Sequence, residues 1–121
     1  LCGHAISSVE ELRAAAREIG MKYDVGCIVK GGHLAGDDVV DVLYDEGEEH
    51  VFTAPRIDAA ETHGAGCAFA AALTAYLARR ELMPEAVRKA KEYVTQALLS
   101  APEVGHHRPL DFCWPERVGN E

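Results

Sequence analysis

The chain has 121 residues, of which 48% are hydrophobic and 26% are charged, and its formal net charge is −8. A chain of this length can bury one ordinary core, and the absence of long Ser-, Gln- or Pro-rich tracts argues against disorder. The acidic balance argues against a nucleic-acid partner, and no apolar stretch is long enough to span a bilayer, so neither nucleic acid nor a membrane is expected.

The first third of the chain predicts a helix followed by a strand. Residues 7–11 combine a serine hydroxyl with a glutamate three residues later, which is a capping signal, and residues 12–19 carry a helical apolar period. Gly20 stands where a helix is expected to end, so we predict a helix over 9–19. Residues 25–29 then predict a buried strand that ends in a glycine-rich turn.

The remainder predicts a hairpin and two helices. Residues 39–44 and 50–53 alternate as strands around a turn at 45–47, which favours an antiparallel hairpin. A long helix is expected over 67–80, and a second one from Pro84 to about Leu99. The order helix, strand, hairpin, helix, helix is typical of an α/β sandwich, and no internal domain boundary is evident.

The segment Gly64-Ala65-Gly66-Cys67 is the first candidate for chemistry. Two glycines around one small residue let the backbone approach a ligand closely, and the helix that follows directs free amides and its positive end to the same place. This arrangement suits a phosphate or a phosphoryl group in transfer. The same helix start favours the thiolate form of Cys67, which could then accept a proton. The alternative interpretation of this segment is an ordinary helix start with small residues and a buried cysteine.

A second candidate is Lys30, which precedes Gly31 and Gly32 at the end of the predicted strand. Ligands of open α/β sheets bind beyond the carboxyl ends of the strands, and an ammonium group there could pair with nucleotide phosphates. The alternative is a solvated lysine beside a turn. Arg56 could brace the glycine loop before the long helix or contact the nucleotide, and His63 could face the phosphates or make hydrogen bonds within its turn.

Several short motifs occur together, at residues 29–34, 54–57, 62–68, 86–94 and 109–112. Their order and spacing resemble those of the hydroxymethylpyrimidine kinase/phosphomethylpyrimidine kinase family of thiamine biosynthesis. The resemblance implies a ribokinase-like three-layer α/β/α sandwich, of which residues 1–121 would be the C-terminal, nucleotide- and phosphate-handling part. Ala65 departs from the threonine usual in the close family, a mild change.

The resemblance also implies the roles of the site residues. Gly64, Ala65, Gly66 and Cys67 would form the anion hole, with Cys67 as the catalytic base. Lys30, Gly31, Gly32, Thr62 and His63 would contact the nucleotide. ATP and magnesium would be the cofactors, and no residue of this chain is assigned as a metal ligand.

Three alternatives remain open at the level of the sequence. The substrate of the enzyme could be hydroxymethylpyrimidine and its monophosphate or a pyridoxal-type alcohol. The chain could also be a catalytically incomplete module that binds a nucleotide or associates with a partner. Because the predicted strand needs neighbours, we expect a homo-oligomer or pairing with a missing N-terminal half. The four separated cysteines favour reduced thiols and a cytoplasmic location.

Overall fold

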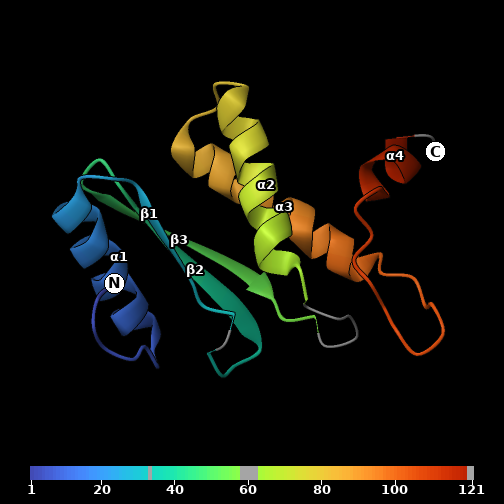
Figure 1. Ribbon diagram of the computed structural model, residues 1–121, viewed down its shortest axis with the longest axis horizontal. Helices are drawn as coiled ribbons and strands as arrows, with labels where there is room; N and C mark the ends of the chain where they lie inside the picture. Colours follow the sequence, from blue (N-terminus) through green and yellow to red (C-terminus); the bar gives the residue numbers. More distant parts are fainter. Residues whose placement is uncertain (33, 58–62, 120–121) are drawn as a thin grey trace. The chain divides into compact units, whose positions relative to one another are not determined.

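The computed structural model describes residues 1–32, 34–57 and 63–119 (Figure 1). Its elements are, in chain order, α1 (Val9–Tyr23), β1 (Cys27–Lys30), β2 (Asp38–Asp45), β3 (Glu48–Pro55), α2 (Ala65–Ala78), α3 (Met83–Leu99) and α4 (Trp114–Gly119). Although the sequence suggested no internal boundary, the chain forms two compact units, Leu1–Arg56 and Ile57–Glu121. The reason is that α1 packs on β1 and β2, whereas α2 packs on α3.

The first unit holds a three-stranded antiparallel sheet in the order β1-β2-β3 (Figure 1). The predicted hairpin is confirmed as β2 and β3, which are joined where Asp45 pairs with Glu48. The two residues of the turn, Glu46 and Gly47, have φ angles of 49° and 85°. Two positive φ values match the twist of a tight hairpin, which explains the glycine at this turn.

Helix α1 begins as predicted but ends later. The Ser8 hydroxyl accepts a hydrogen bond from the Glu11 amide at 3.2 Å, which is the expected N-cap. The prediction that Gly20 ends the helix is wrong, because α1 continues to Tyr23 and is capped by Asp24 in the left-handed region. Gly20 is buried, and a Cβ built on it would overlap the Tyr44 ring. The glycine is therefore needed for close packing of the helix on the sheet.

The first strand also differs from the prediction. Strand β1 starts at Cys27, while Val25 is exposed and donates its amide to the Gly20 carbonyl at 3.1 Å, so it belongs to the end of α1. Strand β1 pairs antiparallel with β2, and Cys27, Ile28 and Val29 are half-buried. Among the described residues β2 is its sole strand partner, so β1 is an edge strand and its sequence is less deeply buried than expected.

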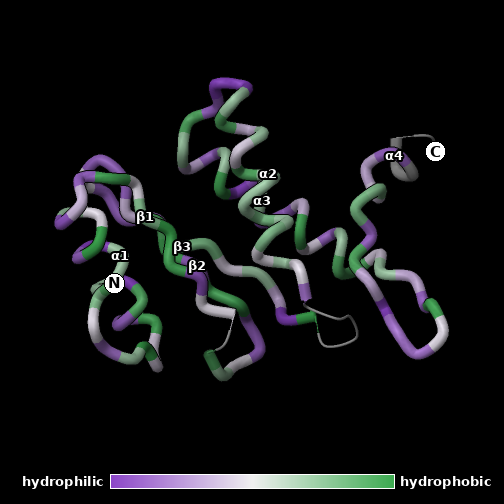
Figure 2. The backbone as a smooth tube through the Cα atoms, viewed as in Figure 1, coloured by the Kyte–Doolittle hydropathy of each residue, from purple (hydrophilic) through white to green (hydrophobic). Residues whose placement is uncertain are grey.

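The second unit is helical. Helix α2 is mostly hydrophobic in Figure 2, yet of its residues only Phe69 is buried. Helix α3 has Pro84 in its first turn, as predicted, and its buried residues recur every three to four positions, as on one face of a helix. The buried apolar residues of this unit are Phe69, Ala86, Val87, Ala90, Val94, Ala97, Ala101 and Leu110. None of the helices in the described part of the chain has the length and apolar character needed to cross a membrane.

Candidate functional site

The start of α2 presents backbone amides without helical partners. Gly64 caps the helix with φ 85° and ψ −6°, and its carbonyl accepts the Ala68 amide at 2.9 Å. The amides of Ala65, Gly66 and Cys67 precede the first such bond, and no described residue accepts from them. Three donors without an acceptor among the described residues therefore lie at the positive end of a 14-residue helix, which is the arrangement that an anion requires.

The two glycines leave this point open. A Cβ built on Gly64 or Gly66 would have no atom of the described residues within 4 Å, so in that part of the chain nothing blocks a ligand beside the backbone. Gly64 is also needed for its positive φ, which other residues rarely adopt. Cys67 is exposed rather than buried, so its side chain is not required by a core. This exposure disfavours the alternative of a buried structural cysteine.

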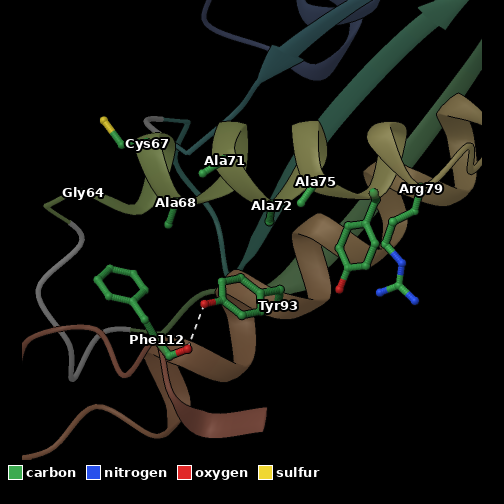
Figure 3. A pocket seen from close by; sticks show the side chains of 10 residues that line it. Gly64, Cys67, Ala68, Ala71, Ala72, Ala75, Arg79, Tyr93 and Phe112 are labelled. Atoms are coloured by element: carbon green, nitrogen blue, oxygen red, sulfur yellow. Dashed lines mark hydrogen bonds between the residues drawn. The ribbon is translucent and has the colours of Figure 1, made fainter. Parts of the chain in front are cut away.

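A cavity of about 680 Å³ extends along α2 from this helix start. Figure 3 shows Ala68 and Ala72 directed toward Tyr93 and Phe112, whereas the Cys67 thiol points away from both rings. The cavity is lined by Gly64, Cys67, Ala68, Ala71, Ala72, Ala75, Tyr76, Arg79, Tyr93 and Phe112. Small side chains on one helix facing aromatic rings leave a slot that suits a flat, apolar ligand group.

Tyr93 and its hydrogen bonds fix one wall of the cavity. Its hydroxyl donates to the Phe112 carbonyl at 2.9 Å, and its own carbonyl accepts from the Trp114 indole at 3.0 Å. Burial raises the pKa of Tyr93, so the hydroxyl remains a proton donor at neutral pH. In the sequence, Tyr93 was included only within the motif at residues 86–94 and was given no role of its own. Its spacing from the buried Ala90 and Ala97 was the available signal.

Lys30 and Gly31 in the first unit are both held by one carboxylate. Asp41 lies opposite Lys30 in the strand register and is fully buried. One of its oxygens lies 3.2 Å from the Lys30 ammonium, and the other accepts the Gly31 amide at 3.1 Å. The Lys30 side chain is nevertheless 39% exposed, so its charge is both anchored and accessible. This buried partner was not predicted.

The other predicted site residues are distributed as follows. Gly32 and His63 are exposed, while Thr62 lies outside the described residues. Arg56 was expected beside the loop before α2, but the carbonyls that it binds belong to the turn after β1. The structure thus brings Lys30 and Gly31 together in one unit, and residues 64–67 together in the other.

No metal ligand set is defined by the described residues. Between residues 1 and 119, apart from the undescribed positions, no three or more His, Cys, Asp or Glu side chains are grouped so that they could hold an ion. All four cysteines are free.

Comparison with known proteins places these features in a family. The family model described as phosphomethylpyrimidine kinase matches residues 1–111. A hydroxymethylpyrimidine/phosphomethylpyrimidine kinase of Streptomyces coelicolor is 44% identical over 115 residues, which are 94% of this chain and 42% of that protein. The thiamine biosynthesis bifunctional protein ThiED of Geobacter sulfurreducens is 41% identical over 112 residues, or 92% of this chain and 23% of that protein.

Solved structures give the same fold. The pyridoxal kinase of Staphylococcus aureus in complex with AMP-PCP and pyridoxal matches with a TM-score of 0.83 and 34% identity, over 93% of this chain and 43% of that chain. The ADP complex of Bacillus subtilis pyridoxal kinase matches with a TM-score of 0.82 and 32% identity, over 94% and 45%.

These likenesses confirm the predicted ribokinase-like α/β class. The chain spans less than half the length of the relatives named here. Because the family model matches residues 1–111 of the 121, the chain belongs to the phosphomethylpyrimidine kinase family.

Proposed function

We propose that this chain is the C-terminal, phosphate-handling part of an ATP-dependent kinase that phosphorylates hydroxymethylpyrimidine and its monophosphate in thiamine biosynthesis. The observation that carries the proposal is the start of α2. There, three amides without acceptors among the described residues, an open backbone at Gly64 and Gly66, and the exposed Cys67 thiol occur within four residues. Family membership supplies the substrate class.

The proposed reaction is transfer of the γ-phosphoryl group of ATP. In the first phosphorylation the acceptor is the hydroxymethyl oxygen, and in the second it is a phosphate oxygen of the monophosphate. In the first, the hydroxyl oxygen forms a bond to the γ-phosphorus, the bond to the β,γ-bridging oxygen breaks, and ADP leaves with that electron pair. The Cys67 thiolate takes the hydroxyl proton as the new bond forms. The amides of Ala65, Gly66 and Cys67 stabilise the negative charge on the transferring group.

Lys30 is proposed to contact the phosphates of ATP as a point charge. Its accessible ammonium, anchored by Asp41, supports this role. Gly31, Gly32, Thr62 and His63 stay in the proposed nucleotide site. Magnesium, when bound with ATP, would neutralise charge on the phosphate oxygens.

The cavity along α2 is proposed to take the apolar side of the nucleotide. It begins at Gly64 and Cys67 and continues between the alanines of α2 and Tyr93, so one ligand could place phosphates at the helix start and a flat ring in the slot. AMP-PCP and ADP are bound by the two pyridoxal kinases with this fold, which supports a nucleotide.

Substitution of the two glycines is expected to separate folding from binding. Gly66→Ala should keep or raise the stability of the fold, because its Cβ meets no atom of the described residues and alanine favours a helix by up to about 1 kcal/mol. The same substitution should weaken ATP binding, because it places a methyl group where the phosphate approaches. Gly64→Ala should lose about 1–2 kcal/mol, because its φ is 85°. Urea unfolding and ATP titration measure both effects. Unchanged ATP affinity in Gly66→Ala would contradict the assignment.

A pyridoxal-type kinase is the second candidate function. It is favoured by the solved structures of pyridoxal kinases at 32–34% identity, one of them in complex with pyridoxal. A third possibility is a nucleotide-binding module without turnover, because the chain spans less than half of its relatives.

Assembly with another chain is proposed as well. Strand β1 has β2 as its sole partner in the described part of the sheet, and an unpaired edge favours addition of a strand. We propose either self-association or pairing with an N-terminal half, in the cytoplasm. Sedimentation of a stable monomer at low and high concentration would contradict self-association.

The test is ATP-dependent phosphorylation by the 121-residue chain, with hydroxymethylpyrimidine and pyridoxal assayed in parallel. Preferential turnover of the pyrimidine supports the proposed function, and preferential turnover of pyridoxal supports the second candidate. Folded protein that binds ATP without turning over either alcohol would support the phosphate-handling part of a longer kinase, with the substrate-binding half outside this chain. Folded protein that neither binds ATP nor turns over would contradict all three.

A further inference from the structure

Arg56, the first residue after β3, binds three carbonyls of one turn. Its Nε donates to the Gly36 carbonyl at 2.9 Å, its Nη1 to that of Gly32 at 2.9 Å, and its Nη2 to that of Leu34 at 2.5 Å. Its own amide donates to the Asp37 carbonyl at 2.8 Å. One side chain and one amide thus hold the turn between β1 and β2 at four carbonyls.

This arrangement is suited to hold the turn in one shape. The guanidinium group is a rigid fork of donors, so bonds to three carbonyls fix their relative positions. Hydrogen bonds from a charged donor are stronger than neutral ones. In the described part of the chain the guanidinium of Arg56 has carbonyl partners and no carboxylate, so its positive charge is retained beside the turn.

The start of the same turn is fixed from the other side. Buried Asp41 on β2 accepts the Gly31 amide and lies beside the Lys30 ammonium. The Leu34 amide donates to the Gly31 carbonyl at 3.0 Å, which links the two halves of the turn. All these residues belong to the first unit.

We infer that Arg56 is a positioning residue for the phosphoryl donor. It holds the turn in the shape that presents Lys30, Gly31 and Gly32 to the phosphates of ATP, and it adds a positive charge there. This role rests on the proposed function, because it requires ATP to bind at this turn. Arg56 acts through the turn and needs no contact with the ligand.

The test compares Arg56→Ala and Arg56→Lys with Arg17→Ala, which removes an exposed arginine of α1 in the same unit. Exchange of the Leu34 amide and the Kd for ATP are measured, with and without millimolar guanidinium. In Arg56→Ala we expect exchange of that amide to rise and the Kd to increase, each about tenfold, as loss of a charged hydrogen bond predicts. Added guanidinium should partly restore both the slow exchange of the Leu34 amide and the Kd for ATP in Arg56→Ala. Both quantities should be intermediate in Arg56→Lys and unchanged in Arg17→Ala.

Three contrary results would each overturn a different claim. Unchanged exchange of the Leu34 amide in Arg56→Ala would show that Arg56 does not hold the turn. Faster exchange with an unchanged Kd for ATP would overturn the positioning role alone and leave the proposed kinase intact. Failure of the unaltered chain to bind ATP would overturn both the proposed function and the role of Arg56 in it.

Discussion

Replacement of Cys67 by alanine is expected to lower kcat for phosphorylation of the alcohol by about 10²–10⁴-fold, the usual contribution of a general base. The thiol is exposed, so its removal leaves no cavity in a core and the free energy of unfolding should change by less than about 0.5 kcal/mol. The Kd for ATP should change little, because the amides that would bind the phosphate belong to the backbone. Release of ADP at saturating substrate, measured beside urea unfolding, gives both quantities.

Three further variants sharpen this prediction. Cys113→Ala removes the other exposed cysteine of the same unit and should leave turnover unchanged. Cys67→Ser should be almost as impaired as alanine, because a hydroxyl is a poor base at neutral pH. Cys67→Asp should recover part of the activity, since a carboxylate can accept the proton and is favoured at a helix start. Turnover of Cys67→Ala within twofold of the unaltered chain would exclude Cys67 as the base.

Replacement of Gly31 by alanine is expected to give a large loss of stability in the first unit. A Cβ at this buried position would overlap the Val40 carbonyl oxygen and lie 2.8 Å from Cδ1 of Leu12. The carbonyl belongs to β2 and cannot move without distorting the sheet. Overpacking of this kind costs about 1–3 kcal/mol.

Gly32 is the matched control for this substitution. It is the next residue in the same turn, is exposed, and has no atom within 4 Å of an added Cβ. Gly32→Ala should change the free energy of unfolding by less than about 0.5 kcal/mol. Urea denaturation of both variants, followed by far-ultraviolet circular dichroism, measures the difference. Equal stability of the two variants would contradict the close packing at Gly31.

Regular elements with local signals could be predicted well from the sequence. The serine cap of α1, the proline in the first turn of α3 and the glycine at the hairpin turn each act within a few residues, and the structure confirms each of them. The errors arose where a distant residue decided the local structure. Gly20 looked like a helix end, but it is a glycine because the Tyr44 ring lies against it.

In the candidate site, too, residues with local signals could be predicted, whereas those that depend on distant partners could not. Gly64 to Cys67 could be identified from four consecutive residues, because a helix start needs no distant partner. The partners of Lys30 and of the turn after β1 could not, because Asp41 reaches Lys30 only through the strand register. Arg56 likewise reaches that turn from the far end of the hairpin, 20–24 residues along the chain.

The start of α2 as an anion site is the central claim, and the amide resonances of Ala65, Gly66 and Cys67 test it most directly. Isotope-labelled chain would be titrated with ATP, and then with adenosine as a control without phosphates. We predict that ATP shifts these three resonances and that adenosine shifts resonances along the cavity, such as that of Tyr93, without them. Binding of ATP to folded chain that leaves all three amides unchanged would contradict the claim.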